Sequence, residues 1–185
     1  MLLILCTSIF SFDFGFSPRS KMDIVTDKII KRVGERLCKK HSMYMAGIGG
    51  GAPTGKLDHI SVSFGRNGGP ISKDQCREIM VDCIQTYLNE INSNEEIRPF
   101  LITYPYTFAN VDITIINFYP DGKKVLDPNI STIGTNKKGI TYAISATRLG
   151  PYKSEVIEPY EEALAKLHPQ AIPKPDTQII TNFQN

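Results

Sequence analysis

Residues 72–91, SKDQCREIMVDCIQTYLNEI, are the stretch that decides the fold. Ser72 and Gln75 form the capping-box pair that starts a helix, and Asp74 stands where the helix dipole favours a carboxylate. Beyond this pair, apolar residues recur at three- and four-residue spacing: Cys76, Ile79, Met80, Cys83, Ile84, Tyr87, Leu88 and Ile91. Such a stripe is typical of a helix that buries one face, so we predict that Ile84, at its middle, lies in the core.

Helix and strand patterns extend in both directions from this helix. Helical spacing predicts a first helix over 20–40. Residues 154–167 are expected to form a third helix with Ser154 as its N-cap, and Pro159, about one turn in, is expected to delay its start or to kink it. The expected strands cover residues 43–48, 60–64, 111–118, 125–133 and 140–147. This order predicts an α+β fold, with a single largely antiparallel sheet of about five strands and helices packed on one face.

The two ends of the chain differ from its middle. Residues 1–19 read as a hydrophobic leader, because Met1 to Phe10 is an apolar run as long as the central region of a signal peptide and too short to span a bilayer. No Lys or Arg precedes this run. We predict export, periplasmic or secreted, with no stable membrane span after leader removal; a cytoplasmic location is the alternative. Residues 20–168 are predicted to form a single domain, and 169–185 an extended tail that contains prolines.

Composition narrows the classes of function. The net charge is only +2 and the basic residues are scattered, which gives no case for a nucleic-acid partner. The four cysteines suggest no disulfide framework. Because no His-x-x-x-His or Cys-x-x-Cys spacing occurs in the sequence, we expect no metal site, and no motif calls for a cofactor.

A glycine-rich loop nearly matches a phosphate-binding loop. Residues 50–56, GGAPTGK, fit its first seven positions, but the eighth is Leu57, where Ser or Thr must hold Mg²⁺. The following residues alternate like a strand, whereas phosphate binding requires a helix N-terminus. We interpret the loop as a flexible strand connection, with Lys56 as a candidate binding residue.

Two further features carry candidate chemistry. His59 begins a strand beside Asp58 and the glycine-rich loop, so these two residues are the candidates for acid–base catalysis. Residues 98–108 form an aromatic loop stiffened by proline, in which Arg98, Phe100, Tyr104 and Tyr106 are candidate binding residues. The alternative is that these aromatic residues cap the core beneath a long loop.

One segment carries a resemblance to a known family. Residues 91–101, INSNEEIRPFL, are followed by YPYT at 104–107 and VDITI at 111–115. Together with the glycine-rich loop, these residues resemble a family of small uncharacterised proteins from chlamydia-like and other intracellular bacteria, over roughly 24–142. The resemblance implies no known activity and favours an exported bacterial protein.

These observations predict an exported bacterial protein that binds a protein partner through the aromatic and glycine-rich loops. The alternative is a small hydrolase or transferase that uses His59 and Asp58. The sequence does not indicate an oligomeric state.

Overall fold

Helix α2 (Lys73–Ser93) forms where the capping box and the apolar stripe predict it. In the computed structural model, which describes residues 19–168, Gln75 N donates to Ser72 Oγ at 3.2 Å and Ser72 N donates to Gln75 Oε1 at 2.9 Å. Ile84 and Tyr87 are fully buried. The Tyr87 hydroxyl also donates to Ile30 O of helix α1 (Lys21–His41) at 3.1 Å. The predicted burial of Ile84 is confirmed.

Six strands form one sheet in chain order. They are β1 Met43–Gly51, β2 His59–Arg66, β3 Val111–Asn117, β4 Thr132–Asn136, β5 Gly139–Ser145 and β6 Tyr152–Glu158. Neighbouring strands are antiparallel except β2 and β3, which are parallel because the α2 crossover returns the chain to the same end of the sheet. The predicted α+β class and the largely antiparallel sheet are confirmed, with six strands rather than five.

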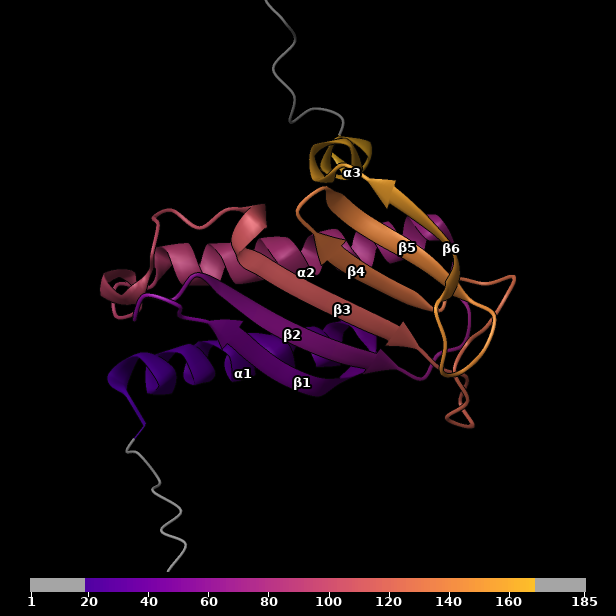
Figure 1. The fold of residues 1–185 in the computed structure, drawn as a ribbon, viewed down its shortest axis with the longest axis horizontal. Helices are drawn as coiled ribbons and strands as arrows, with labels where there is room; N and C mark the ends of the chain where they lie inside the picture. The colour runs from indigo at the N-terminus through magenta and orange to yellow at the C-terminus, as the bar shows by residue number, and fades with distance from the viewer. Residues whose placement is uncertain (1–18, 169–185) are drawn as a thin grey trace, which may run out of the picture.

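Two long helices cover one face of the sheet. Figure 1 shows α1 and α2 side by side behind the strands, while the short helix α3 (Tyr160–Leu167) lies beside the end of β6. Ile60, Val62 and Phe64 of β2 are buried toward these helices, so the alternating Ser61 and Ser63 face the other way. Within residues 19–168, no helix lies over that second face (Figure 1), which we call the open face.

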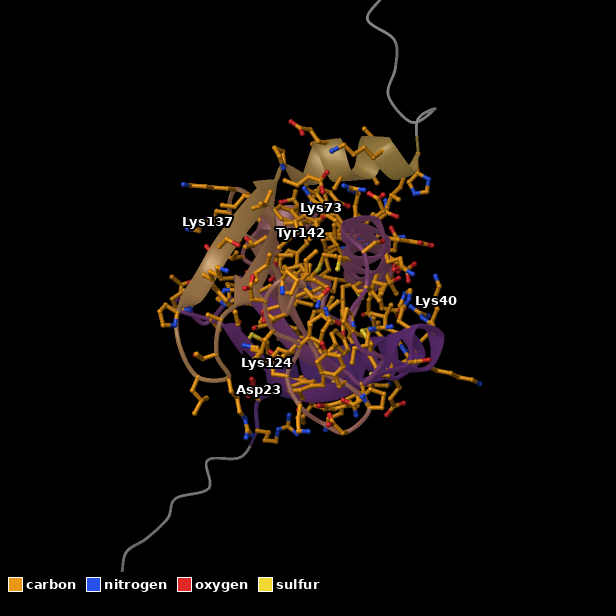
Figure 2. All side chains as sticks on the ribbon, turned by 90° about the vertical axis from the view of Figure 1, so that its right-hand side faces the viewer. Asp23, Lys40, Lys73, Lys124, Lys137 and Tyr142 are labelled. Carbon is orange, nitrogen blue, oxygen red and sulfur yellow. The ribbon has the colours of Figure 1, made fainter. Side chains whose placement is uncertain are left out.

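Side chains from the sheet and the two long helices fill the space between them (Figure 2). The core lies in this layer, and its largest fully buried side chains include Phe64, Ile84, Tyr87 and Ile113. The layered arrangement leaves the loops at the two ends of the strands as the irregular parts of the domain. Those loops hold most of the residues that the sequence singles out.

The prediction that Ser154 caps the third helix is wrong, whereas the delayed start expected from Pro159 is confirmed. Residues 152–158 form β6, and α3 begins only after Pro159. Proline has no N–H to donate and disfavours helical geometry in the residue before it. The segment before Pro159 instead pairs with β5, for example Tyr142 with Val156. The expected strand at 125–133 is also displaced, because β4 starts at Thr132.

The predicted leader at 1–19 lies almost entirely outside the described residues, and the predicted tail at 169–185 lies wholly outside them. Among the helices that the structure describes, none is long and apolar enough to cross a membrane.

Candidate functional site

The glycine-rich loop and the aromatic loop meet at the N-terminal ends of β2 and β3. Leu57 N donates to Phe100 O at 2.7 Å, and Ile102 N donates to Leu57 O at 2.9 Å. Leu57 also forms an isolated parallel bridge with Leu101, and both side chains are buried. The strand that follows the glycine-rich loop begins at His59, so the helix N-terminus that a phosphate-binding loop requires is not at this position.

Tyr106 is a structural residue of this junction. Its backbone is held at both ends by Asn92, whose Oδ1 accepts from Tyr106 N at 2.7 Å and whose Nδ2 donates to Tyr106 O at 2.9 Å. The Tyr106 hydroxyl donates to Leu57 O at 2.6 Å, and burial raises the pKa of this phenol. The ring is only 2% exposed, so Tyr106 offers no surface to a partner, in contrast to its predicted role.

The other predicted binding residues stay at the surface to different extents. Tyr104 is 49% exposed, and the Arg98 guanidinium carbon lies 4.6 Å from the centroid of its ring. Phe100 is half-buried. Lys56 is exposed, and its Nζ donates to Pro99 O, which ties the glycine-rich loop to the aromatic loop a second time. Lys56, Arg98 and Tyr104 are therefore the members of the set that combine exposure with a contact that holds them in place.

His59 lies between two carboxylates, and only one of them is its sequence neighbour. His59 Nδ1 is 3.2 Å from Asp58 Oδ2, and His59 Nε2 is 3.7 Å from Asp112 Oδ2, within ion-pair distance. Asp112 comes from β3, where the parallel pairing sets it opposite Ser61. The alternation of strand 111–115 indicates that Asp112 points outward, but nothing in the sequence links it to His59.

The arrangement around His59 differs from that of a nucleophilic triad. In a triad, one ring nitrogen faces a carboxylate and the other faces the nucleophile. Here carboxylates flank both nitrogens of His59. The side chains of His59, Asp58 and Asp112 are 34%, 46% and 53% exposed, so the cluster lies at the surface with carboxylate lone pairs still free.

A glycine in the glycine-rich loop is required by the position of His59. A Cβ atom at Gly51 would lie 2.5 Å from His59 Cε1, which is closer than side-chain atoms approach. A side chain at Gly51 would therefore have to displace the His59 imidazole from this position. The loop thus has a packing role at the site, independent of any ligand.

We call the accessible part of this surface the loop corner. It consists of Asp58, His59, Arg98, Ile102, Tyr104 and Asp112. The loop corner adjoins the open face, on which strand alternation places small side chains: Gly47, Gly49, Ser61, Ser63, Thr114, Gly134 and Thr141. Small side chains leave the sheet surface approachable by the backbone of another chain.

The loop corner lacks the geometry of a metal site. In the described part of the chain, no group of three or more His, Cys, Asp or Glu side chains is arranged to hold a metal ion. What the corner provides instead is the carboxylate pair of Asp58 and Asp112, the guanidinium of Arg98 and exposed apolar surface.

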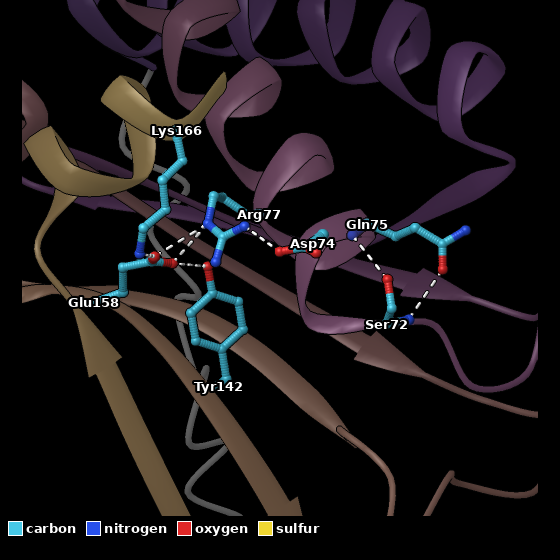
Figure 3. Close-up of polar contacts among 7 residues, drawn as sticks. All are labelled: Ser72, Asp74, Gln75, Arg77, Tyr142, Glu158 and Lys166. Atoms are coloured by element: carbon cyan, nitrogen blue, oxygen red, sulfur yellow. Dashed lines mark hydrogen bonds and ion pairs between the residues drawn. The ribbon is translucent and has the colours of Figure 1, made fainter. Parts of the chain in front are cut away.

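A second cluster of charged side chains lies on the opposite face of the sheet (Figure 3). Glu158 of β6 accepts hydrogen bonds from Arg77 Nε, at 2.9 Å to Oε2, from the Tyr142 hydroxyl at 2.6 Å, and from Lys166 Nζ. Asp74 accepts a further bond from Arg77. These residues join α2, β5, β6 and α3. We call them the Glu158 cluster.

Burial separates this cluster from the loop corner. Glu158 is only 3% exposed and Arg77 only 6%. Burial alone would raise the pKa of Glu158, but the hydrogen bonds from Arg77, Lys166 and Tyr142 lower it to about 2. Figure 2 shows Lys73 beside Tyr142, and its Nζ lies 4.8 Å from the ring centroid. No lone pair of Glu158 is left for a partner, so the cluster holds elements together.

No family model, curated protein or solved structure matches this chain, so the loop corner is interpreted from its own chemistry.

Proposed function

We propose that the protein acts by binding a protein partner through the loop corner. The observation that carries this proposal is the pair of exposed carboxylates, Asp58 and Asp112, held on either side of His59 at a rigid sheet end. Their positions are set by two paired strands and by hydrogen bonds between two loops. A pair of carboxylates held in place in this way binds without the entropic cost of ordering a loop.

The chemistry of the corner indicates which kind of partner fits it. Two exposed carboxylates complement a Lys or Arg side chain. Ile102, whose N–H bonds to Leu57 O next to Asp58, and Tyr104 of the same loop are exposed at 44% and 49% and offer apolar contact, and tyrosine is common among residues that dominate binding energy. We therefore propose a partner segment that carries a basic residue next to an apolar one.

A peptide-display selection on the purified full chain tests this proposal. The selected peptides should share a Lys or Arg beside an apolar residue. The Asp58→Asn/Asp112→Asn double variant should bind them at least about tenfold more weakly, since one charge-assisted contact is worth roughly 1.5–3 kcal/mol. Tyr104→Ala should also weaken binding.

The matched control is Glu161→Gln, which removes an exposed carboxylate on α3. It should bind the peptides as the wild type does. Selected peptides without a basic residue, or equal binding by the double variant, would refute the proposal.

A second candidate function rests on His59 itself. A histidine fixed by a neighbouring carboxylate is suited to proton transfer, and Asp58 lies 3.2 Å from its ring. This supports a small hydrolase or transferase. A screen of ester, amide and phosphoester substrates separates the two candidates, because turnover that is abolished by His59→Gln favours the enzyme.

We also propose that the protein is exported, on the strength of the apolar run at residues 1–10. This run lies outside the described residues. Expression with the native N-terminus followed by mass spectrometry of each cell fraction tests it. Export with removal of the residues before about Lys21 is expected, and intact material found only in the cytoplasm would contradict it.

A further inference from the structure

Strand β6 ends the sheet on the side away from β1, and its backbone is open along the outer edge (Figure 1). Ser131 N donates to Ala143 O at 2.9 Å, so the backbone of Ala143 faces β4. The backbone N–H and C=O groups of Tyr142 and Ile144, on either side of Ala143, therefore point to β6, where these residues pair with Val156 and Ser154. By the same alternation, Glu155 and Ile157 direct their N–H and C=O groups to the outer edge, where no described strand pairs with them.

Strand β6 exposes three large apolar side chains along with the charges of Lys153 and Glu155. Tyr152, Val156 and Ile157 are 44%, 53% and 42% exposed, and they make up three of the ten exposed large hydrophobic residues in the described chain. An exposed apolar edge strand is a template for pairing with another strand. The other edge, β1, is rich in glycine between Gly47 and Gly51 and is interrupted by a bulge near Met45, so it pairs less readily.

The charge pattern of β6 selects a second copy of this chain as the pairing strand. When two β6 strands pair antiparallel about a two-fold axis at Ser154, Lys153 lies opposite Glu155 of the other copy, and this occurs twice. The same register sets Tyr152 opposite Val156. Shifting the axis by one residue puts Glu155 opposite Glu155, or Lys153 opposite Lys153, and like charges in facing positions are unfavourable.

We infer that the protein forms a two-fold dimer through antiparallel pairing of β6 about Ser154. Two six-stranded sheets then join into one continuous sheet. The loop corners lie at the N-terminal ends of β2 and β3, three strands or more from β6, and stay free, so the dimer presents two partner sites. The dimer depends on β6 and not on the loop corner. A failed test of the dimer would therefore leave the proposed function unaffected, and a failed test of the proposed function would leave the dimer unaffected.

Sedimentation of the full chain over micromolar to millimolar concentration tests the dimer. Wild-type protein should pass from monomer to dimer in this range, because edge pairing buries little area. Glu155→Lys and Lys153→Glu should each sediment as a monomer alone, since each places like charges opposite one another. An equimolar mixture of the two variants should dimerise, because Lys then faces Glu at all positions.

Thermal melts check that both variants fold, because Lys153 also pairs with Asp127 at 2.7 Å. A variant that keeps the wild-type β6 supplies an independent measurement. Ser154→Cys should form an intermolecular disulfide under mild oxidation, whereas Lys137→Cys, in the turn between β4 and β5, should not. A wild-type monomer at millimolar concentration, monomers in the mixture of folded variants, or equal cross-linking of the two cysteine variants would overturn the inference.

Discussion

The Glu158 cluster and the loop corner both gather charged side chains on the same sheet, yet they differ in what surrounds them. Glu158 and Arg77 are buried between the sheet and α2, and every strong acceptor is used within the chain. Asp58, His59 and Asp112 lie at the edge of the open face with free carboxylate lone pairs. A buried charge must be fully paired because desolvation is costly, whereas an exposed one is compensated by water. Burial therefore makes the Glu158 cluster a stabilising element, whereas exposure leaves the loop corner free for binding.

The largest expected effect comes from breaking the buried cluster. Arg77→Met leaves Glu158 with fewer partners and should lower the free energy of unfolding by about 3–5 kcal/mol. Arg36→Met removes a comparable cation whose side chain is 56% exposed and which pairs with Glu90 at 3.5 Å. This control should change the free energy of unfolding by less than about 1 kcal/mol. Similar losses in urea melts of the two variants would remove the contrast between buried and exposed charges.

Acid should weaken the buried cluster over a defined range of pH. The pKa of Glu158 is lowered from its ordinary value of 4.5 to about 2 in the folded protein. The unfolded state therefore binds this proton first as pH falls, so the stabilisation is complete above about 4.5 and is lost progressively toward 2. The loss should be on the order of 3 kcal/mol.

Urea melts between pH 6 and pH 2 measure this dependence. Glu158→Gln, which cannot titrate at this position, should be less stable than the wild type at pH 6 and should lose less stability on acidification. If its pH dependence equals that of the wild type, Glu158 is not the group responsible.

Removing one hydroxyl from a buried tyrosine and one from an exposed tyrosine compares the two regions more directly. Tyr142→Phe removes a buried hydrogen bond of 2.6 Å to Glu158 and should lower the free energy of unfolding by about 1–3 kcal/mol. Tyr104→Phe removes an exposed hydrogen bond of 3.1 Å to Asn92 O and should cost less than about 0.5 kcal/mol. Equal costs in denaturant melts would show that the surroundings of the hydroxyl do not matter.

The smallest expected effect belongs to the loop corner. Asp112→Asn removes an exposed carboxylate 3.7 Å from His59, and it should change the free energy of unfolding by less than about 0.5 kcal/mol. Thermal and urea melts against the wild type measure this. A loss near that of Arg77→Met would assign Asp112 to stability and would count against a binding role.

Local patterns predicted a large part of the fold. The capping box at Ser72 and the stripe through Ile84 specify α2, because a helix is set by contacts within a few residues. The alternation of apolar and polar residues in β2 and β3 likewise predicts which of their side chains are buried. The prediction failed at residues 154–158, where Ser154 was expected to cap a helix and β6 forms instead. Pairing with β5 and the restriction imposed by Pro159 outweighed that local preference.

The candidate site was less predictable than the fold. His59, Asp58, Arg98 and Tyr104 were identified from their types and neighbours. Tyr106 was placed in the same set, although it is buried. An aromatic residue is as typical of a binding surface as of a core. Only the hydrogen bonds between Asn92 and the Tyr106 backbone show that this residue belongs to the core.

The sequence by itself determined the two long helices, most strands and the α+β class, because these follow from periodicity and capping within short segments. Only the tertiary structure decided which charges meet. Asp112 reaches His59 through the parallel pairing of β2 with β3, and Glu158 reaches Arg77 because β6 ends against α2. Contacts of this kind join residues far apart in the chain, and no local pattern encodes them. Burial follows from the same long-range packing, so it is the fold that makes one cluster structural and leaves the other exposed.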